Sequence, residues 1–580
     1  MRSAHPLPLV LSFLLIGGGL VAWWAASFEH AAVLAHLNAI SPDGDVRSYS
    51  SAFHTRVQGH LIVLAVGLLA LGLLVLAFRS KAVLVLAGER GPGHLRQRWL
   101  SVRKDLVKRT SPAHKRMVLL MLFVGVVVRM WMLSLPVTYD EAFTYTYYAS
   151  RPLHIILVDH SYPNNHILHT LLVKLTTSVL GVGKVSLRLP AFIAGVLVMP
   201  LWYVFVRRMF NRHIGLLALA FVVASARLIE YSALGRGYSI TWLFLIGELV
   251  LGRDLVKENS PFTAMLVGVL CALGMWTVPT MIYGAAMVYI WMFLSIWTRY
   301  KDSLKARLLN LAWSAVVFVV LTGLFYAPVL VLSGVEGMLH HDTMPDNDLA
   351  TFSARYGDDA LHLWAWFTDP SHYWVGVAGF MGLVFAAYIS TKYRFLLAGM
   401  FLGAVPLVVV QLMVAPPRVW TYTLFIFHLG SAIALYYLLK LVHDKLWPAF
   451  SERRRTFMAA LLITAAFVWP AMTVLLNDSG RTTQAADTAE YLSKKAGAQD
   501  RIMVQFPWEA PVEFEAIARG MDRAAFHRRG PVQGRLFVVV GTVEGQSLAG
   551  VAAHNELPAS DLPPMVMVQD HEGLKTFAAP

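Results

Sequence analysis

Two adjacent carboxylates, Asp140 and Glu141, follow directly on an apolar segment in the stretch LPVTYDEAFTYTYYAS, residues 135–150. The tyrosines and threonines after them can form hydrogen bonds but carry no charge that would neutralise the acids. A carboxylate in this position can take the proton of an attacking hydroxyl group when its neighbours keep it ionised. We therefore predict that Asp140 is a general base. Glu141 is its catalytic companion, or else it orients Asp140 or caps the helix that follows.

Three later connections between apolar segments carry further polar residues. The connection RPLHIILVDHSYPNNHILHT contains Asp159, a further candidate catalytic acid, unless this aspartate only begins a helix. Arginines in the next connections suit a phosphate ligand, because the planar guanidinium group binds two phosphate oxygens at once. The candidate substrate-binding residues are His160, Asn165, His166, Arg227, Tyr231, Arg236, Tyr238 and Arg418.

Simpler structural roles compete with some of these assignments. Arg227 and Arg236 are both close enough in sequence to Glu230 to pair with it and do nothing else. His166 and His169 are three residues apart, a spacing that two metal ligands on one helical face would have. Anchoring at a membrane interface is commoner, so no residue is assigned to a metal. His340, His341 and Asp342 form a similar cluster, and they too are not assigned to a metal. Two acids in the first loop are nevertheless compatible with a divalent ion, Mg²⁺ or Mn²⁺.

The elements that must position these residues are membrane helices. Of the 580 residues 57% are hydrophobic and only 14% are charged, whereas charged residues make up about a quarter of an ordinary soluble domain. Several segments exceed the roughly 18 apolar residues that cross a bilayer. The single cysteine, Cys271, excludes an intrachain disulfide. The net charge of +14 comes from Lys and Arg in short connections, which indicates cytoplasmic loops and no nucleic-acid partner.

The basic connections determine the sidedness of the chain. The densest of them, residues 79–116, is placed in the cytoplasm, after spans at 7–26 and 60–78. The next span, 117–135, then delivers Asp140 and Glu141 to the outer face. Segment 164–181 is best read as an amphipathic helix in the interface, because counting it as a span would reverse the later basic loops. We thus expect about thirteen transmembrane helices, the last near 456–476.

The chain changes character from Asn477 onward, where the long apolar runs end. DTAEYLSKKAG and VEFEAIARGM predict helices, and RIMVQF, RLFVVV and MVMVQ predict strands. We therefore expect a small C-terminal α/β domain on the outer face that shapes a cleft above the membrane. The predicted parts are an N-terminal extension with two spans (1–116), a transmembrane catalytic part (117–476) and a soluble domain (477–580).

The acids and arginines on one face indicate a substrate with a lipid tail in the bilayer and a phosphate head at its surface. The reaction would displace this lipid phosphate from a sugar by an acceptor nucleophile. A transporter or flippase for a lipid-linked substrate is the alternative, but it commonly shows related halves and ionisable groups in the middle of its spans. A membrane scaffold that recruits partners is a third possibility, and it leaves the cluster of polar residues without a purpose.

Several segments also resemble a family of membrane enzymes. YDE after an outward helix, NNHILHTLL, SLRLPAFIAGVLVMPLWYVFVRRMFNRHIGLLA, SARLIEYSALGRGYSITWLFL and PPRVWTYTLFIFHLG are similar to segments of the GT-C glycosyltransferases. The nearest members are the bacterial relatives of the aminoarabinose and protein-mannosyl transferases. The resemblance covers about residues 117–440 well and the soluble tail loosely. NNHIL and the two spans before residue 117 depart from the family pattern.

The resemblance implies a GT-C-like fold with interfacial helices in the first catalytic loop. It also implies a polyprenyl-phosphate-sugar donor and a glycan, lipid or protein acceptor on the outer face. Asp140 matches the position of the catalytic base, and Arg418 matches an arginine near the lipid phosphate. Inversion at the sugar carbon is carried over from the family. We expect a multi-pass protein of a bacterial inner membrane, in contact with membrane lipids, with its C-terminal domain in the periplasm.

Overall fold

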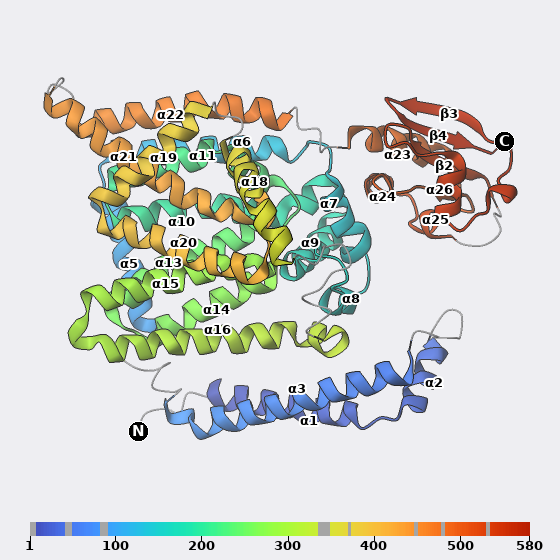
Figure 1. Cartoon of the computed structure of the whole chain (residues 1–580), viewed down its shortest axis with the longest axis horizontal. Helices are drawn as coiled ribbons and strands as arrows, with labels where there is room; N and C mark the ends of the chain where they lie inside the picture. The colour runs from blue at the N-terminus through green and yellow to red at the C-terminus, as the bar shows by residue number, and fades with distance from the viewer. Residues whose placement is uncertain are drawn as a thin grey trace.

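The computed structural model describes residues 7–40, 49–81, 91–334, 348–368, 373–445, 451–476, 482–528 and 534–579. Figure 1 shows an N-terminal helical hairpin, a large helical bundle and a small domain beside one end of the bundle. This architecture confirms the predicted class, a helical membrane protein with a small C-terminal α/β domain. The histidine cluster at residues 340–342 lies outside the described residues.

The N-terminal hairpin consists of α1 (Leu7–Ala26) and α3 (Ser51–Ala77), joined through α2 (His30–Ile40). The two long helices approach closely at Gly72, whose carbonyl accepts a hydrogen bond of 2.9 Å from the Ser12 hydroxyl. A Cβ atom at Gly72 would lie 2.7 Å from the Ile16 side chain, so only glycine permits this approach. The hairpin meets the bundle where His60 donates to the carbonyl of Val331 at 2.8 Å.

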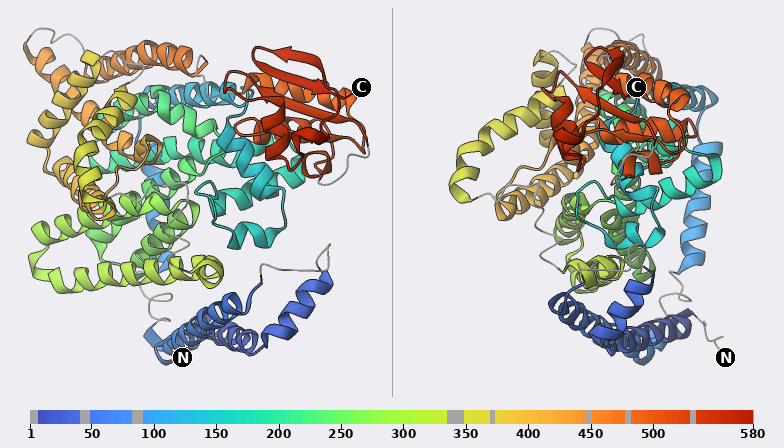
Figure 2. Two further views of the ribbon diagram at one scale, coloured as in Figure 1. Left: turned by 45° about the vertical axis from the view of Figure 1, so that its right-hand side comes forward. Right: turned by 90° about the vertical axis from the view of Figure 1, so that its right-hand side faces the viewer.

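The helix that follows the hairpin, α5 (Pro92–Lys108), lies across the ends of the bundle helices. Figure 1 places it at the end of the bundle that is remote from the C-terminal domain, and Figure 2 shows the hairpin, bundle and domain from two further sides. The helix begins with Pro92, whose fixed φ angle and missing N–H suit the first helical position. This amphipathic helix belongs to the basic segment that the sequence places in the cytoplasm.

Most helices of the bundle are long and run roughly parallel to one another, and α18 crosses them steeply (Figure 1). Its helices are α6 (Pro112–Met132), α10 (Lys184–Met209), α11 (Arg212–Ala224), α12 (Ala226–Ala233), α13 (Tyr238–Glu258), α14 (Pro261–Thr277), α15 (Ile282–Arg299), α16 (Leu304–Ser333), α18 (Leu349–Thr368), α19 (Tyr373–Ile389), α20 (Thr391–Gln411), α21 (Thr423–Lys445) and α22 (Glu452–Leu476). Short η2 (Pro279–Met281), η3 (Lys301–Ser303) and η4 (Pro417–Tyr422) helices join some of them. Fully buried aromatic side chains, among them Trp202, Phe205 and Trp291, fill the centre.

Among the described residues, eight helices are long and apolar enough to cross a membrane. The number is nine if α11 and α12, which meet at a bend of 64°, form one broken span. Three further apolar helices are shorter. These helices make the chain a multi-pass membrane protein, and the expected total of about thirteen spans stays a prediction.

A compact helical segment connects α6 to α10. It contains α7 (Tyr139–Phe143), the π-helical η1 (Thr144–Ala149), α8 (Leu153–Val158) and α9 (Ile167–Leu180). With 14 residues, α9 is about 21 Å long, too short to cross the roughly 30 Å of hydrocarbon in a bilayer. This length agrees with the predicted interfacial helix at 164–181. The acid pair thus lies on a short helix between the long helix α6 and the short apolar helix α9.

The C-terminal domain contains α23 (Thr483–Lys495), β1 (Arg501–Met503), α24 (Glu509–Ala518), α25 (Ala524–His527), β2 (Leu536–Gly541), α26 (Leu548–His554), η5 (Ala559–Asp561), β3 (Val566–His571) and β4 (Leu574–Ala578). The sheet order is β1-β2-β4-β3; β1 and β2 are parallel, and the other pairs are antiparallel. The predicted helices and strands are all present. The prediction missed β4, whose sequence LKTFA mixes charged and apolar residues at the end of the chain.

Candidate active site

Asp140 lies on α7 at the meeting point of four separate parts of the chain. Its Oδ2 is 3.6 Å from Nη2 of Arg236, which lies between α12 and α13, and 3.6 Å from Nη1 of Arg418, in η4. Its Oδ1 accepts a hydrogen bond of 3.3 Å from the amide of Asn164. The side chain keeps 32% of its surface exposed. The structure therefore brings together three residues that are far apart in sequence, a reachable carboxylate between two cations.

The two guanidinium groups determine the protonation of Asp140. Burial raises the pKa of this carboxyl, but Arg236 and Arg418 outweigh burial, so that the pKa lies below its usual value. The amide of Asn164 acts in the same direction, because it donates to the charged form. Asp140 is therefore ionised at neutral pH and able to accept a proton, although its affinity for the proton is reduced.

Glu141 has a different environment from its neighbour. The side chain is fully buried, and its two oxygens accept bonds of 2.7 and 2.8 Å from Nε and Nη2 of Arg188 on α10. It also accepts from the backbone N–H groups of Gly235 at 2.6 Å and Thr138 at 3.0 Å, the latter as part of a capping box. Burial opposes ionisation of this carboxyl, yet the ion pair with Arg188 keeps its pKa below the usual value. These contacts fit the capping and orienting role for Glu141 and leave none of its oxygens facing a substrate.

Arg236 is almost completely buried but has hydrogen-bonding capacity to spare. Its Nη1 donates to the Thr144 hydroxyl at 3.4 Å, and its Nε has no partner in the part of the chain that the structure describes. Nη2 lies 3.5 Å from Nε2 of His166. Because Nδ1 of His166 accepts the N–H of Gly237 at 2.9 Å, the proton of the neutral ring is on Nε2, and two donors face each other there. In the described part of the chain, the carboxylate of Asp140 at 3.6 Å is thus the only acceptor near Nη2 of Arg236, and this distance leaves the N–H groups able to bind a further acceptor.

His166 is held neutral in this position. Burial first, and then the charge of Arg236, lower the pKa of His166 well below its usual value. A Cβ atom at Gly237 would lie 3.0 Å from Nδ1 of this ring and 2.8 Å from Thr277 Cγ2. Glycine is therefore required where the backbone approaches the imidazole. His166, predicted as a substrate contact, supports the loop that carries Arg236.

Arg418 and two tyrosines complete the side of the site that faces away from α7. Arg418 follows two prolines at the start of η4, and 39% of its side chain is exposed. The side chains of Tyr238 and Tyr231 lie near its guanidinium group. The rings of these tyrosines meet edge to face with centroids 5.3 Å apart. The predicted residues Tyr231, Tyr238, Arg236 and Arg418 therefore form one surface beside Asp140.

The other predicted residues make contacts that fit structural roles. Arg227 forms an ion pair of 3.0 Å with Glu230 and stacks on Trp366. The ion pair agrees with the structural role that the sequence analysis gave as the alternative for Arg227. Oδ1 of Asp159 accepts the N–H of Ser161 at 3.0 Å, within its own loop. The remaining two residues, Asn165 and His160, are buried; Asn165 donates to the carbonyls of Ile156 and Asp159, and His160 lies edge-on to Tyr326.

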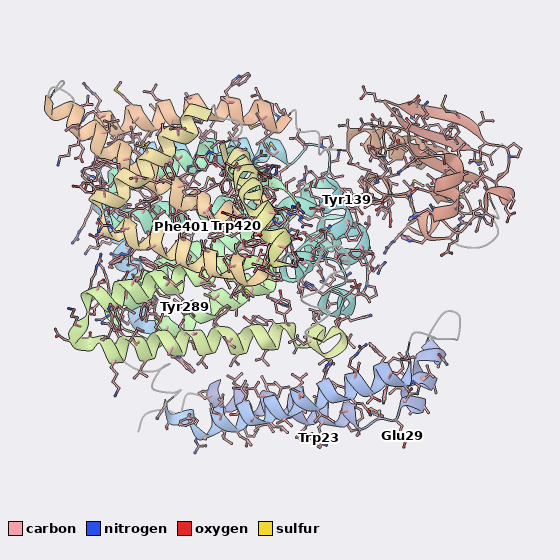
Figure 3. All side chains as sticks on the ribbon, in the orientation of Figure 1. Trp23, Glu29, Tyr139, Tyr289, Phe401 and Trp420 are labelled. Carbon is pink, nitrogen blue, oxygen red and sulfur yellow. The ribbon has the colours of Figure 1, made fainter. Side chains whose placement is uncertain are left out.

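The C-terminal domain packs directly on the helix that carries Asp140. The Tyr139 hydroxyl donates to Glu509 on α24 at 2.7 Å, and the sticks of Figure 3 place Tyr139 on the side of the bundle that faces this domain. Phe514 and Ala510 of α24 are buried in one apolar cluster with Ala142 of α7. The sequence predicted a domain above the cleft, but it contained no sign of which residues join the domain to α7.

Arg523, in the turn before α25, holds the same domain on η1. It donates to the carbonyl of Thr146 at 2.8 Å and to the Ser150 hydroxyl at 2.9 Å. A further bond of 2.9 Å joins it to Glu513 within the domain. Specific polar contacts thus fix the C-terminal domain to α7 and η1, next to the site.

The donor set at Asp140 does not fit a divalent cation. Two guanidinium groups flank the carboxylate, and the adjacent carboxylate, Glu141, is already paired with Arg188. Across the described ranges, no group of three or more His, Cys, Asp or Glu side chains is placed to hold a metal ion. Use of Mg²⁺ or Mn²⁺ stays a prediction.

Comparisons with known proteins agree with this architecture. The model of the family described as dolichyl-phosphate-mannose-protein mannosyltransferase matches residues 161–326. ArnT from Cupriavidus metallidurans in the apo state is similar with a TM-score of 0.55 and 12% identity, over 80% of this chain and 98% of ArnT. Its complex with undecaprenyl phosphate matches with a TM-score of 0.53 and 12% identity, over 80% of this chain and 97% of ArnT. No curated protein matches. At this identity the likeness is one of fold, and it confirms the fold that the sequence resemblance predicted.

Proposed function

We propose that this chain, which has the fold of the GT-C glycosyltransferases, moves a sugar from a polyprenyl-phosphate donor to an acceptor on the outer face of the membrane. One observation carries the proposal: the ionised Asp140 is held between Arg236 and Arg418, with part of its surface exposed. A carboxylate and two cations are what a transfer reaction with an anionic leaving group requires.

The two arginines are the proposed phosphate site. Arg236 has an unpartnered Nε and an open Nη2 in the described part of the chain, and Arg418 is partly exposed, so both can donate to phosphate oxygens. Their charges would stabilise the lipid phosphate as it leaves with the electrons of the broken bond. ArnT from Cupriavidus metallidurans, which has a similar fold, binds undecaprenyl phosphate, and this supports a ligand of the same class here.

Asp140 is the proposed general base. The oxygen or nitrogen of the acceptor attacks the first carbon of the sugar while the bond from this carbon to the phosphate oxygen breaks. The proton of the acceptor passes to Asp140, and the lipid phosphate leaves with one further negative charge. A single displacement of this kind inverts the configuration of the carbon. The acceptor approaches from the aqueous side, beneath the domain that Tyr139 and Glu509 join to α7.

Donor binding would also change the strength of the base. Without a donor, Arg236 and Arg418 interact with Asp140 and lower its pKa. A phosphate bound to the same arginines neutralises them, so the pKa of Asp140 rises and the carboxylate becomes a better proton acceptor. The base would therefore gain strength only when the sugar donor is in place, which limits reactions without a donor.

Sugar transfer from a radiolabelled polyprenyl-phosphate donor to a membrane extract tests the role of Asp140. Asp140→Asn should lower transfer at least a hundredfold, because general-base catalysis contributes about 10²–10⁴-fold, while the protein stays folded. Asp159→Asn is the matched control, since its carboxylate bonds within its own loop, and it should keep most of the activity. Equal activity of wild type and Asp140→Asn would refute the proposed base.

Lipids that co-purify with the full chain test the donor class. Mass spectrometry of wild type should detect a polyprenyl phosphate or its glycosylated form, and Arg418→Ala should lose it. If wild type and variant retain only the same bulk phospholipids, the proposed phosphate site at the two arginines is refuted, and the alternative function as a transporter is favoured.

A further inference from the structure

A cavity lies at the end of the bundle opposite to Asp140. It has a volume of about 520 Å³ and is formed by α5 and by the last turns of α10 and α13. The other ends of α10 and α13 reach the active site, through Arg188 and Tyr238. With 21 residues, α13 is about 31 Å long, so the two sites are separated by roughly the thickness of a membrane core. The proposed transfer reaction does not use this cavity.

The wall of the cavity is strongly basic. Its cationic members come from three helices and the residue after α5: Arg98, Arg109, Arg207, Arg208, Arg253 and Lys257. The carboxylates of the wall are Asp105 and Glu258. One further carboxylate, Asp254, lies directly behind the wall. Six cations against three acids leave an excess of three positive charges around one cavity.

One buried carboxylate holds three of these arginines in place. Asp254, with 2% of its side chain exposed, lies 2.8 Å from Arg208, 3.1 Å from Arg98 and 3.2 Å from Arg253. The three guanidinium groups are themselves mostly buried. Cations gathered in this way repel one another unless an anion offsets their charge. The arrangement is thus preorganised for an anion larger than one carboxylate.

The cations at the rim are exposed and less restrained. Arg109 and Lys257 line the cavity, and in the described part of the chain neither makes an ion pair. Loop cations that only set membrane orientation need no common cavity and no buried carboxylate between them. Membrane orientation therefore does not explain why six cations from separate helices line one cavity.

The helix that closes the cavity is suited to the head-group region of a membrane. Val102 and Leu106 of α5 pack against the core of the bundle. Trp99, Leu100 and Val107 of the same helix are exposed. A basic helix with exposed tryptophan and aliphatic side chains binds in the interface, where anionic lipid head groups are found. The cavity is therefore accessible from the level of the lipid phosphates.

We propose that this cavity binds a phosphate-bearing anionic head group, through the guanidinium groups of its wall and the rim cations Arg109 and Lys257. Planar guanidinium groups bind phosphate oxygens in pairs, and basic pockets between helices on the cytoplasmic side of membrane proteins bind anionic lipid heads. The phosphate can come from a phospholipid of the inner leaflet or from a soluble phosphate ester, which have the same head-group chemistry.

Native mass spectrometry of the full chain in detergent tests the proposal, with short-chain phosphatidylglycerol, phosphatidylcholine and glycerol phosphate as probes. Arg109→Gln with Lys257→Gln removes the rim cations and leaves the network around Asp254 intact. The matched control is Arg103→Gln with Lys104→Gln, two exposed cations of α5 that do not line the cavity. Phosphatidylglycerol should bind wild type and the control equally, and the rim variant about thirtyfold more weakly, since each of the two surface cations is worth about 1 kcal/mol.

The lipid probes and the soluble probe, glycerol phosphate, distinguish the two possible sources of the phosphate group. If glycerol phosphate competes with phosphatidylglycerol at equal concentration, the cavity is a site for a soluble phosphate ester; if it does not, the ligand is a lipid. Equal binding of phosphatidylglycerol and phosphatidylcholine to wild type would overturn the proposal. An equal loss of binding in the rim variant and in the control would also overturn it, because general surface charge would then explain the effect.

Discussion

The ion pair between Glu141 and Arg188 allows the position of the catalytic helix to be tested separately from the chemistry. The structure gives Arg188 six hydrogen bonds: two to the carboxylate of Glu141 and four to backbone carbonyls at the end of α6 and just after it. Both side chains are 0% exposed. Arg188→Met therefore leaves a buried carboxylate without its cation, which destabilises the folded protein by about 3–5 kcal/mol.

The double variant Arg188→Met with Glu141→Leu should be more stable than this single variant. The double variant has no buried unpaired carboxylate, and the backbone carbonyls that lose Arg188, each at a cost of about 1–3 kcal/mol, are unsatisfied in both variants. Stability is measured by thermal or urea unfolding of the detergent-solubilised protein, and transfer is measured per folded molecule. We expect the single and double variants to lose transfer to a similar extent, since either change releases α7 from α10.

Two results would refute this reasoning. If Arg188→Met unfolds at the same temperature or urea concentration as wild type, the ion pair does not hold the helix. If Arg188→Met keeps its transfer per folded molecule while the addition of Glu141→Leu abolishes it, Glu141 takes part in the chemistry and the catalytic role predicted for it from the sequence is correct.

Three further predictions concern the site and the C-terminal domain that packs beside it. Because Arg418 contributes to the low pKa of Asp140, Arg418→Gln should raise that pKa and move the acidic limb of the pH profile of kcat/KM to higher pH, and an unchanged limb would contradict the pairing. Gly237→Ala should lower transfer at least tenfold, since its Cβ would lie 2.8 Å from a side-chain carbon, whereas Gly323→Ala on α16, with nothing within 4 Å, should be neutral. Arg523→Ala removes the two hydrogen bonds that join the C-terminal domain to η1 and should speed amide hydrogen exchange in α7 and η1; unchanged exchange would show that the other contacts of the domain hold it without Arg523.

The sequence was sufficient to predict the long apolar helices, a short helix within 164–181 and the soluble tail. The short helices η1, α8 and η4 beside the site were not predicted. The adjacent pair of acids and the family resemblance predict Asp140 as the base, and the suitability of guanidinium groups for phosphate predicts Arg236 and Arg418 as ligands. That these three meet within 3.6 Å depends on tertiary packing between segments almost 280 residues apart, which periodicity does not encode.

The residues that the sequence analysis missed have weaker local signals. Arg188 follows a serine and a leucine at the start of a long apolar helix, where a cation typically reaches toward the head groups. Its burial against Glu141 becomes visible only once α7 and α10 are packed. Glu509 and Arg523 lie in a tail with ordinary soluble patterning, so nothing in their neighbourhood distinguishes them from surface residues. The signal that existed was the LGRG sequence, whose glycines at 235 and 237 permit close backbone approach to Glu141 and His166.

Three consecutive residues of α7 have three different tasks. Tyr139 donates to the C-terminal domain, and Glu141 is fixed to α10, so the backbone on each side of Asp140 is held from opposite directions. Asp140 keeps about a third of its side-chain surface exposed. The distances of 3.6 Å from its Oδ2 to the guanidinium nitrogens of Arg236 and Arg418 are longer than those of tight hydrogen bonds. A base must be positioned firmly but must exchange its partners during the reaction. Rigid neighbours and loose cations meet both requirements, which is why the arrangement favours Asp140 over Glu141 as the residue that accepts the proton.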